Sequence, residues 1–194
     1  MRLSKVGDKV DPKVFTTIKQ CRLRCAEFSQ DAMEALNSAF SDFGFVIEIK
    51  KNAVIDKPIQ ILNFKTISTA LYPKFIVIAD KFSKFSLVEL HVSEFSKGVV
   101  DSWQNTNFEM VISEGSQCDL IRLQDESLVA THVGINRIYL DKNSRLETLS
   151  VSAGSKLGRN ELSIHLIGEG AEAQVNGMTI SGGSQHLDNK TLID

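Results

Sequence analysis

The spacing of hydrophobic and polar residues along the chain changes near Gly44. Between residues 13 and 43, apolar residues recur three or four positions apart, as at Phe15 and Ile18. This period predicts amphipathic helix, and the absence of Gly and Pro from the segment supports it. We expect two short helices or one broken helix, with residues 29–31 starting the second helix.

After this point the pattern changes to short apolar runs separated by small turns. Polar and apolar residues alternate inside several runs, so that Phe108, Met110 and Ile112 fall on one face. Alternation predicts β-strand, and no long helical pattern separates the runs, which argues against a fold of alternating strands and helices. Examples of the expected strands are residues 43–50, 74–80, 85–92, 107–113, 118–123, 136–141, 145–152 and 161–167.

The turns between these runs repeat along the chain. Each contains a small residue, and these residues are separated by 33, 28 and 27 positions: Ser83, Ser116, Ser144 and Ala171. A repeat of this length, built from short strands, predicts a β-solenoid whose coils bury their inner faces by stacking on one another. A flat β-sandwich is the competing architecture, because the repeat is irregular. We expect a helical segment over residues 1–44 and a β-solenoid core over residues 45–194.

A glycine pattern near the end of the chain raises a different possibility. Gly168, Gly170 and Ala173 fit G-x-G-x-x-A, the fingerprint of dinucleotide-binding domains. Such a site needs a helix directly after the glycines, because the helix N-terminus holds the pyrophosphate. Here the turn signal Asn176-Gly177 follows after only a few residues, so a helix does not fit. We interpret the glycines as a turn between strands.

Composition and charge narrow the choice of function. The chain has 194 residues and a net charge of −2, which gives no reason to expect general binding to nucleic acid or anionic membranes. It contains neither an apolar run long enough to span a membrane nor a secretory signal. Its three cysteines, Cys21, Cys25 and Cys118, are too few for a disulfide framework, so we expect a cytoplasmic protein.

The residue types that usually carry chemistry do not form a recognisable motif. The four histidines lie in separate runs without metal-ligand spacing, although stacked coils leave a neighbourhood of His165 and His186 open: His91, His132, His165 and His186. Cys118 starts a strand at a core position of the repeat, and Cys21 and Cys25 fit helix packing better than metal binding. We expect no catalytic residue and no metal ligand.

Two stretches of the chain resemble the SufB/SufD family, the scaffold proteins of the Suf system of iron–sulfur cluster assembly. The stretch LGRNELSIHLIGEGAEAQVNGMTISGGSQHLDNKTLID (157–194) resembles the family core, and residues 31–64 resemble its entry into the β-domain. The matching motif positions of the first stretch are Arg159, Asn160, Gly168–Ala171, Gly177, Gln185, Asp188 and Thr191. The match is closer to SufD than to SufB, because residues 86–95 lack the cysteine expected in SufB.

The resemblance implies a mainly β protein with a right-handed parallel β-helix, preceded by a short α-helical segment. It implies a non-catalytic scaffold that pairs with a SufB-like protein and a SufC-like ATPase, with a transient iron–sulfur cluster held by the complex rather than a cofactor held by this chain. The family's SufD histidine and its SufC-binding helices would lie beyond Asp194, so we expect a fragment that self-associates through its C-terminal coil.

The polar family-motif residues have two interpretations: Arg159, Asn160, Gln185 and Asp188. They either line a polar path or interface at the working end of the scaffold, or satisfy backbone groups at the corners of coils. We favour the second interpretation. Two other functions stay open from the residues alone, a solenoid carbohydrate-active enzyme and a generic β-solenoid interaction module.

Overall fold

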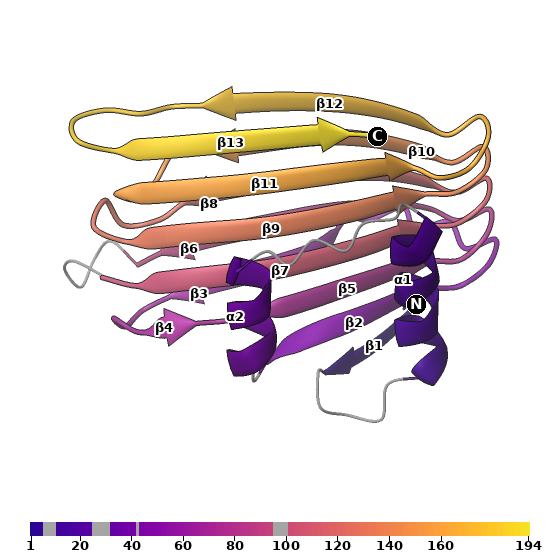
Figure 1. Ribbon diagram of the computed structural model, residues 1–194, viewed down its shortest axis with the longest axis horizontal. Coiled ribbons are helices and arrows are strands. Elements are labelled where there is room, and N and C mark those ends of the chain that lie inside the picture. The colour runs from indigo at the N-terminus through magenta and orange to yellow at the C-terminus, as the bar shows by residue number, and fades with distance from the viewer. Residues whose placement is uncertain (6–10, 25–31, 42, 95–100) are drawn as a thin grey trace.

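The computed structural model describes residues 1–5, 11–24, 32–41, 43–94 and 101–194. Two β-sheets face each other, and two helices lie on the outside of one of them (Figure 1). The helices are α1 (Pro12–Arg24) and α2 (Ala32–Phe40). The first sheet contains β1 (Arg2–Lys5), β2 (Gly44–Ile49), β4 (Ala70–Leu71), β5 (Lys74–Ala79), β7 (Trp103–Ile112), β9 (Thr131–Leu140), β11 (Leu157–Leu166) and β13 (His186–Ile193). The second sheet contains β3 (Ile59–Lys65), β6 (Lys84–Ser93), β8 (Gln117–Asp125), β10 (Arg145–Ser152) and β12 (Glu172–Thr179).

The strands form a parallel β-solenoid of about five turns. From β2 onward, the chain passes between the two sheets, and each named strand pairs in parallel with the equivalent strand of the neighbouring coil. The first strand, β1, is the exception, because it pairs antiparallel with β2 at the edge of the first sheet. The mainly β solenoid expected from the repeat is therefore confirmed, and the flat sandwich is not the architecture.

The small residues of the sequence repeat stack at one corner of the solenoid. The strands that follow them are in register, pairing Lys84 with Gln117 and Gln117 with Arg145. Within the stack, the Ser116 hydroxyl donates to the Asp80 carbonyl at 2.8 Å and accepts from the Ser83 backbone amide at 3.1 Å. A small hydroxyl side chain satisfies backbone groups inside a tight corner, which explains why the repeat keeps small residues there.

The glycine pattern at residues 168–173 is a turn of the same kind. It connects β11 with β12, which begins at Glu172 directly after the glycines. Gly170 has a φ of 72°, a left-handed conformation that glycine adopts without strain. The expectation that no dinucleotide-binding helix follows is confirmed.

The two helices cover part of the outer face of the first sheet (Figure 1). One side of α1 packs on that sheet through an apolar cluster: Val14, Ile18, Cys21, Val46, Ile76, Val111 and Tyr139. Arg22 binds Glu34 of α2 at 2.6 Å and Glu109 of β7 at 2.9 Å, so charges also tie both helices to the sheet. Two helices are confirmed, while residues 29–31 and Cys25 lie outside the described residues. No helix of the described ranges is long and apolar enough to cross a membrane.

Several strands are longer at their starts than the sequence pattern indicates. Strand β7 begins at Trp103 and β9 at Thr131, several residues before the expected strands. Their first residues include polar side chains that face inward, such as Gln104 and His132, so hydrophobic alternation is lost there. The example runs did not include β1, β3, β4 or β13, whereas β12 follows the turn at residues 168–173, where the repeat predicts a strand.

We predict that Cys118 resists thiol reagents in the folded protein. Its side chain is 1% exposed in the apolar core, and burial raises the pKa of its thiol, which removes the reactive thiolate. Mass spectrometry after iodoacetamide treatment should find Cys118 unmodified under native conditions and modified in denaturant. Rapid labelling of the native protein would contradict the burial of this core position.

Candidate functional site

The interior of the solenoid is apolar near the tight corners and polar near the opposite corners. Along β6, the inward-facing Phe85 and Leu87 belong to the apolar core, whereas the next inward-facing residues, Glu89 and His91, are buried charged or polar groups. Parallel pairing extends both halves into β8: Phe85 pairs with Cys118, Leu87 with Leu120, Glu89 with Arg122 and His91 with Gln124. Stacked coils thus build a polar chamber from positions that are far apart in the sequence.

The first sheet supplies the opposite wall of this polar chamber. Gln104 and Thr106 of β7 are buried and hydrogen-bonded to each other at 2.7 Å. In β9, His132 and Gly134 occupy the paired positions, and Asn160 of β11 pairs with Gly134. All of these positions precede the apolar residues of the same strands, so the division of the interior holds in both sheets.

A cavity of about 460 Å³ opens within the polar chamber. Its wall includes His91 and His132 and continues along the C-terminal strands to Thr179 and Thr191. Its lining includes small residues of three strands: Gly134, Ser150, Ser152 and Gly177. Its volume lies within the range of small-molecule sites, and its lining combines polar groups with charged side chains.

Glu89 is the centre of a buried ionic network in the chamber. Its carboxylate contacts the Arg122 Nε at 3.0 Å and the His91 Nε2 at 3.0 Å. Burial alone would raise the pKa of Glu89, but Arg122 and His91 outweigh it and hold the pKa at about 2. Arg122 also lies over the ring of Phe108, with its Cζ 4.3 Å from the ring centroid. The carboxylate therefore stays charged inside the protein.

Glu126 forms a second cluster at the corner that follows β8. It contacts the buried ammonium of Lys65, and its Oε2 lies 2.9 Å from the His132 Nδ1. Gln124 and Ser155 donate hydrogen bonds to the same carboxylate oxygen at 3.2 and 3.3 Å. Burial lowers the pKa of the Lys65 ammonium to about 7. Lys65 and Glu126 compensate each other's charge in an interior that would otherwise exclude both.

The two histidines face each other between these clusters, with ring centroids 4.8 Å apart. Gln104 Nε2 donates to His91 Nδ1 at 2.7 Å, so His91 carries its proton on Nε2 and donates it to Glu89. Burial lowers the pKa of His91 to about 4 and that of His132 to about 3. Both rings are therefore neutral near pH 7, the protonation state in which imidazole binds metals.

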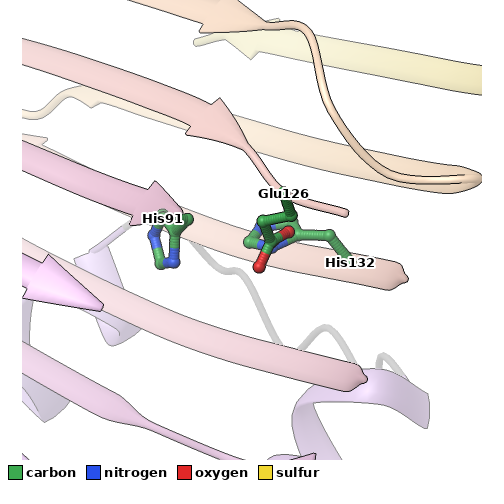
Figure 2. A group of neighbouring side chains, drawn as sticks. All are labelled: His91, Glu126 and His132. Carbon is green, nitrogen blue, oxygen red and sulfur yellow. The ribbon is translucent and has the colours of Figure 1, made fainter. Parts of the chain in front are cut away.

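Three residues of the chamber together form a group of metal-ligand type. His91, Glu126 and His132 each place one ligand atom within 4.8 Å of the others, and all three are buried. Figure 2 shows Glu126 and His132 turned toward each other, with His91 facing them. The strand ends of β6 and β8 and the start of β9 bring these side chains together. Imidazole nitrogen and carboxylate oxygen suit iron and zinc.

Asn160 is the family-motif residue that the structure places in the chamber. It lines the cavity, and its Nδ2 donates to Ser152 Oγ at 3.1 Å across the interior. Its amide also crowds Gly134, where a Cβ would lie 2.7 Å from Asn160 Oδ1. The location of Asn160 therefore fits both interpretations, because it lines the polar cavity and also makes a structural contact.

The other three motif residues lie away from the chamber wall. Gln185 donates to the carbonyls of Ala153 and Ser155 at 2.9 Å and accepts from Gly182, which ties two corners together. Arg159 and Asp188 are paired positions of β11 and β13, half exposed, with Nε and Oδ2 3.9 Å apart. All four motif residues lie close to an adjacent coil, which fits the structural interpretation: Arg159, Asn160, Gln185 and Asp188. Their functional role stays a prediction.

The histidine pair that the structure brings together differs from the one left open by the sequence. His165 lies near the C-terminal end of β11. His186 is the first residue of β13 and pairs with Leu157, at the opposite end of β11. The pair formed by His91 and His132 comes from opposite sheets. The register of the repeat could have placed His91 at an inward position, but nothing in the sequence shows which residue of the facing sheet opposes it.

Two family models together match residues 9–194 of the chain. The family described as "SUF system FeS cluster assembly, SufBD core domain" matches residues 62–194, and "SufBD protein N-terminal region" matches residues 9–61. The chain is 24% identical over 124 residues to "Protein ABCI7, chloroplastic" of Arabidopsis thaliana, covering 63% of this chain and 26% of that protein. It is also 24% identical over 167 residues to "Iron-sulfur cluster assembly SufBD family protein slr0076" of Synechocystis, covering 81% of this chain and 37% of that protein.

Proposed function

The chain belongs to the SufBD family, and from this premise we propose that it acts as a scaffold subunit in iron–sulfur cluster assembly. The observation that carries the proposal is the match of the family's core domain to residues 62–194, which contain nearly all coils of the solenoid. A relative from Synechocystis is itself named as an iron–sulfur cluster assembly protein. The match favours this role over a carbohydrate-active enzyme and over a generic interaction module.

In the proposed role, the protein supplies a rigid surface and does not catalyse a reaction. Parallel coils pair along their whole length, so the solenoid holds its outer side chains in fixed positions. The partners we propose are a SufB-like protein and a SufC-like ATPase, in the cytoplasm, with the nascent cluster as cargo of the complex. The chain itself would hold no part of that cluster permanently.

The chain spans about a quarter and about a third of the length of the two relatives, so the test uses the full natural protein. We expect the full-length protein to co-purify with SufB-like and SufC-like partners from its native host. We also expect deletion of its gene to lower the activity of iron–sulfur enzymes, such as aconitase, and a plasmid copy to restore it. Iron-independent dehydrogenases measured in the same extracts provide the control.

The opposite result would remove the proposal. Folded, full-length protein that recovers neither partner, in cells whose iron–sulfur enzymes are unaffected by the deletion, would exclude a scaffold role. Binding of a partner with no effect on those enzymes would support the interaction module instead.

A further inference from the structure

We propose that His91, Glu126 and His132 form a binding site for one divalent transition-metal cation, of the class of ferrous iron or zinc, inside the solenoid. The inference does not depend on the scaffold role, because it concerns only side chains of the described coils. It departs from the expectation, based on spacing alone, that the chain holds no metal ligand.

The geometry of the three side chains carries the proposal. Their ligand atoms lie within 4.8 Å of one another, a spacing that small side-chain rotations convert into a shared coordination sphere. His132 Nδ1 is 2.9 Å from Glu126 Oε2, yet it has no hydrogen-bond partner among the described residues. The ring nitrogen is therefore a buried group without a hydrogen bond, and a cation that bridges it to the carboxylate would satisfy it.

Neighbouring amides offer further ligands. Gln104 and Gln124 are buried and donate through their Nε2 atoms to His91 Nδ1 and Glu126 Oε2. Their Oε1 atoms have no hydrogen-bond partner within the part of the chain that the structure describes. An amide flip would direct these oxygens toward the ligand group and free the His91 nitrogen. Two nitrogens and one to three oxygens form a set that suits iron and zinc rather than magnesium or calcium.

A route to the site and a source of charge balance are also present. The cavity of about 460 Å³ reaches both histidines, so an ion can approach them from inside the chamber. Lys65 now supplies the positive charge opposite Glu126, with its side chain 2% exposed. A cation and the Lys65 ammonium would compete for the same carboxylate. Removal of this ammonium should therefore strengthen metal binding, whereas loss of a ligand should weaken it.

The test uses Co²⁺, whose visible absorption reports nitrogen and oxygen ligands. The protein, purified without a histidine tag and stripped with a chelator, should bind one Co²⁺ per chain. His132→Gln and Glu126→Gln should each weaken Co²⁺ binding by at least about 10- to 100-fold. A loss of this size is typical even for residues that only hydrogen-bond to a metal ligand, so loss of a ligand itself should cost no less. Lys65→Met should strengthen Co²⁺ binding about tenfold or more, because a competing positive charge is removed. Excess Mg²⁺ should not displace Co²⁺.

The matched control is His165→Gln, which removes another buried histidine by the same substitution. His165 is 2% exposed and stacks on Tyr139, away from the ligand group. Its Co²⁺ affinity should equal that of the unaltered protein. Equal binding by the Glu126→Gln and His132→Gln variants, or no stoichiometric binding by the unaltered protein, would overturn the site. If a ligand variant does not fold, the Lys65→Met variant provides the test. Unchanged or weaker Co²⁺ binding by folded Lys65→Met protein would also overturn the proposed site.

Discussion

Arg122→Met is expected to lower the free energy of unfolding by about 3–5 kcal/mol, the loss typical when one partner of a buried ion pair is removed. Arg122 is the cation that contacts Glu89 at 3.0 Å, and the Glu89 side chain is 2% exposed. Without the guanidinium, the carboxylate must either remain charged in a poorly solvating interior or take up a proton. Its folded-state pKa of about 2 shows how strongly its present neighbours favour the charged form.

A double-mutant cycle separates the ion pair from simple loss of packing. Glu89→Gln alone should also destabilise the protein, because it leaves the Arg122 charge without its carboxylate. The double variant removes both charges, so its loss should be clearly smaller than the sum of the two single losses. Urea unfolding followed by circular dichroism measures all four proteins.

Arg159→Met provides the surface control for the same substitution. Arg159 is 49% exposed and pairs with Glu161 on the outside of the sheet, so its loss should cost at most about 1 kcal/mol. Comparable losses for the Arg122 and Arg159 variants, or strict additivity in the cycle, would show that the buried pair contributes little beyond packing.

The repeat of corners was predictable from sequence, whereas the contents of the polar chamber were not. Small residues return every 27 to 33 positions because each tight corner imposes the same steric demand. Ser83 and Ser116 show this by the hydrogen bond between their hydroxyl groups. Glu126 and Lys65 obey no such rule. Lys65 ends one strand and Glu126 lies in the corner after another, so their contact depends on how these coils stack. That stacking is set by the pairing register of the strands, which the sequence pattern does not show.

The same reasoning explains the strand starts that the pattern misplaced. Hydrophobic alternation marks a strand only where its inner face is apolar, as in the second half of β7 with Phe108 and Met110. Where the inner face is polar, as at Gln104, the strand continues without that signal because ladder hydrogen bonds do not depend on side chains. Such departures from alternation mark the candidate site itself.

Gly154→Ala is the second substitution for which we expect a large effect, a loss of about 3 kcal/mol or more in the free energy of unfolding. Gly154 lies in the buried corner after β10, directly against the preceding coil. A Cβ at this position would lie 2.0 Å from the Glu126 backbone nitrogen and 2.4 Å from its carbonyl oxygen. Backbone atoms cannot rotate away as a side chain does, so the two corners must separate.

Gly182→Ala is the matched control, because Gly182 occupies the corresponding corner of the next coil, after β12. A Cβ there would meet no atom of the described residues within 4 Å, so its free energy of unfolding should change by less than about 1 kcal/mol. Both variants add one methyl group to a corner glycine, and thermal or urea unfolding compares them directly. Equal stability of the two would mean that the corner at Gly154 tolerates separation from Glu126. A selective loss at Gly154 would show that close backbone contact between the corners at Gly154 and Glu126 stabilises the fold.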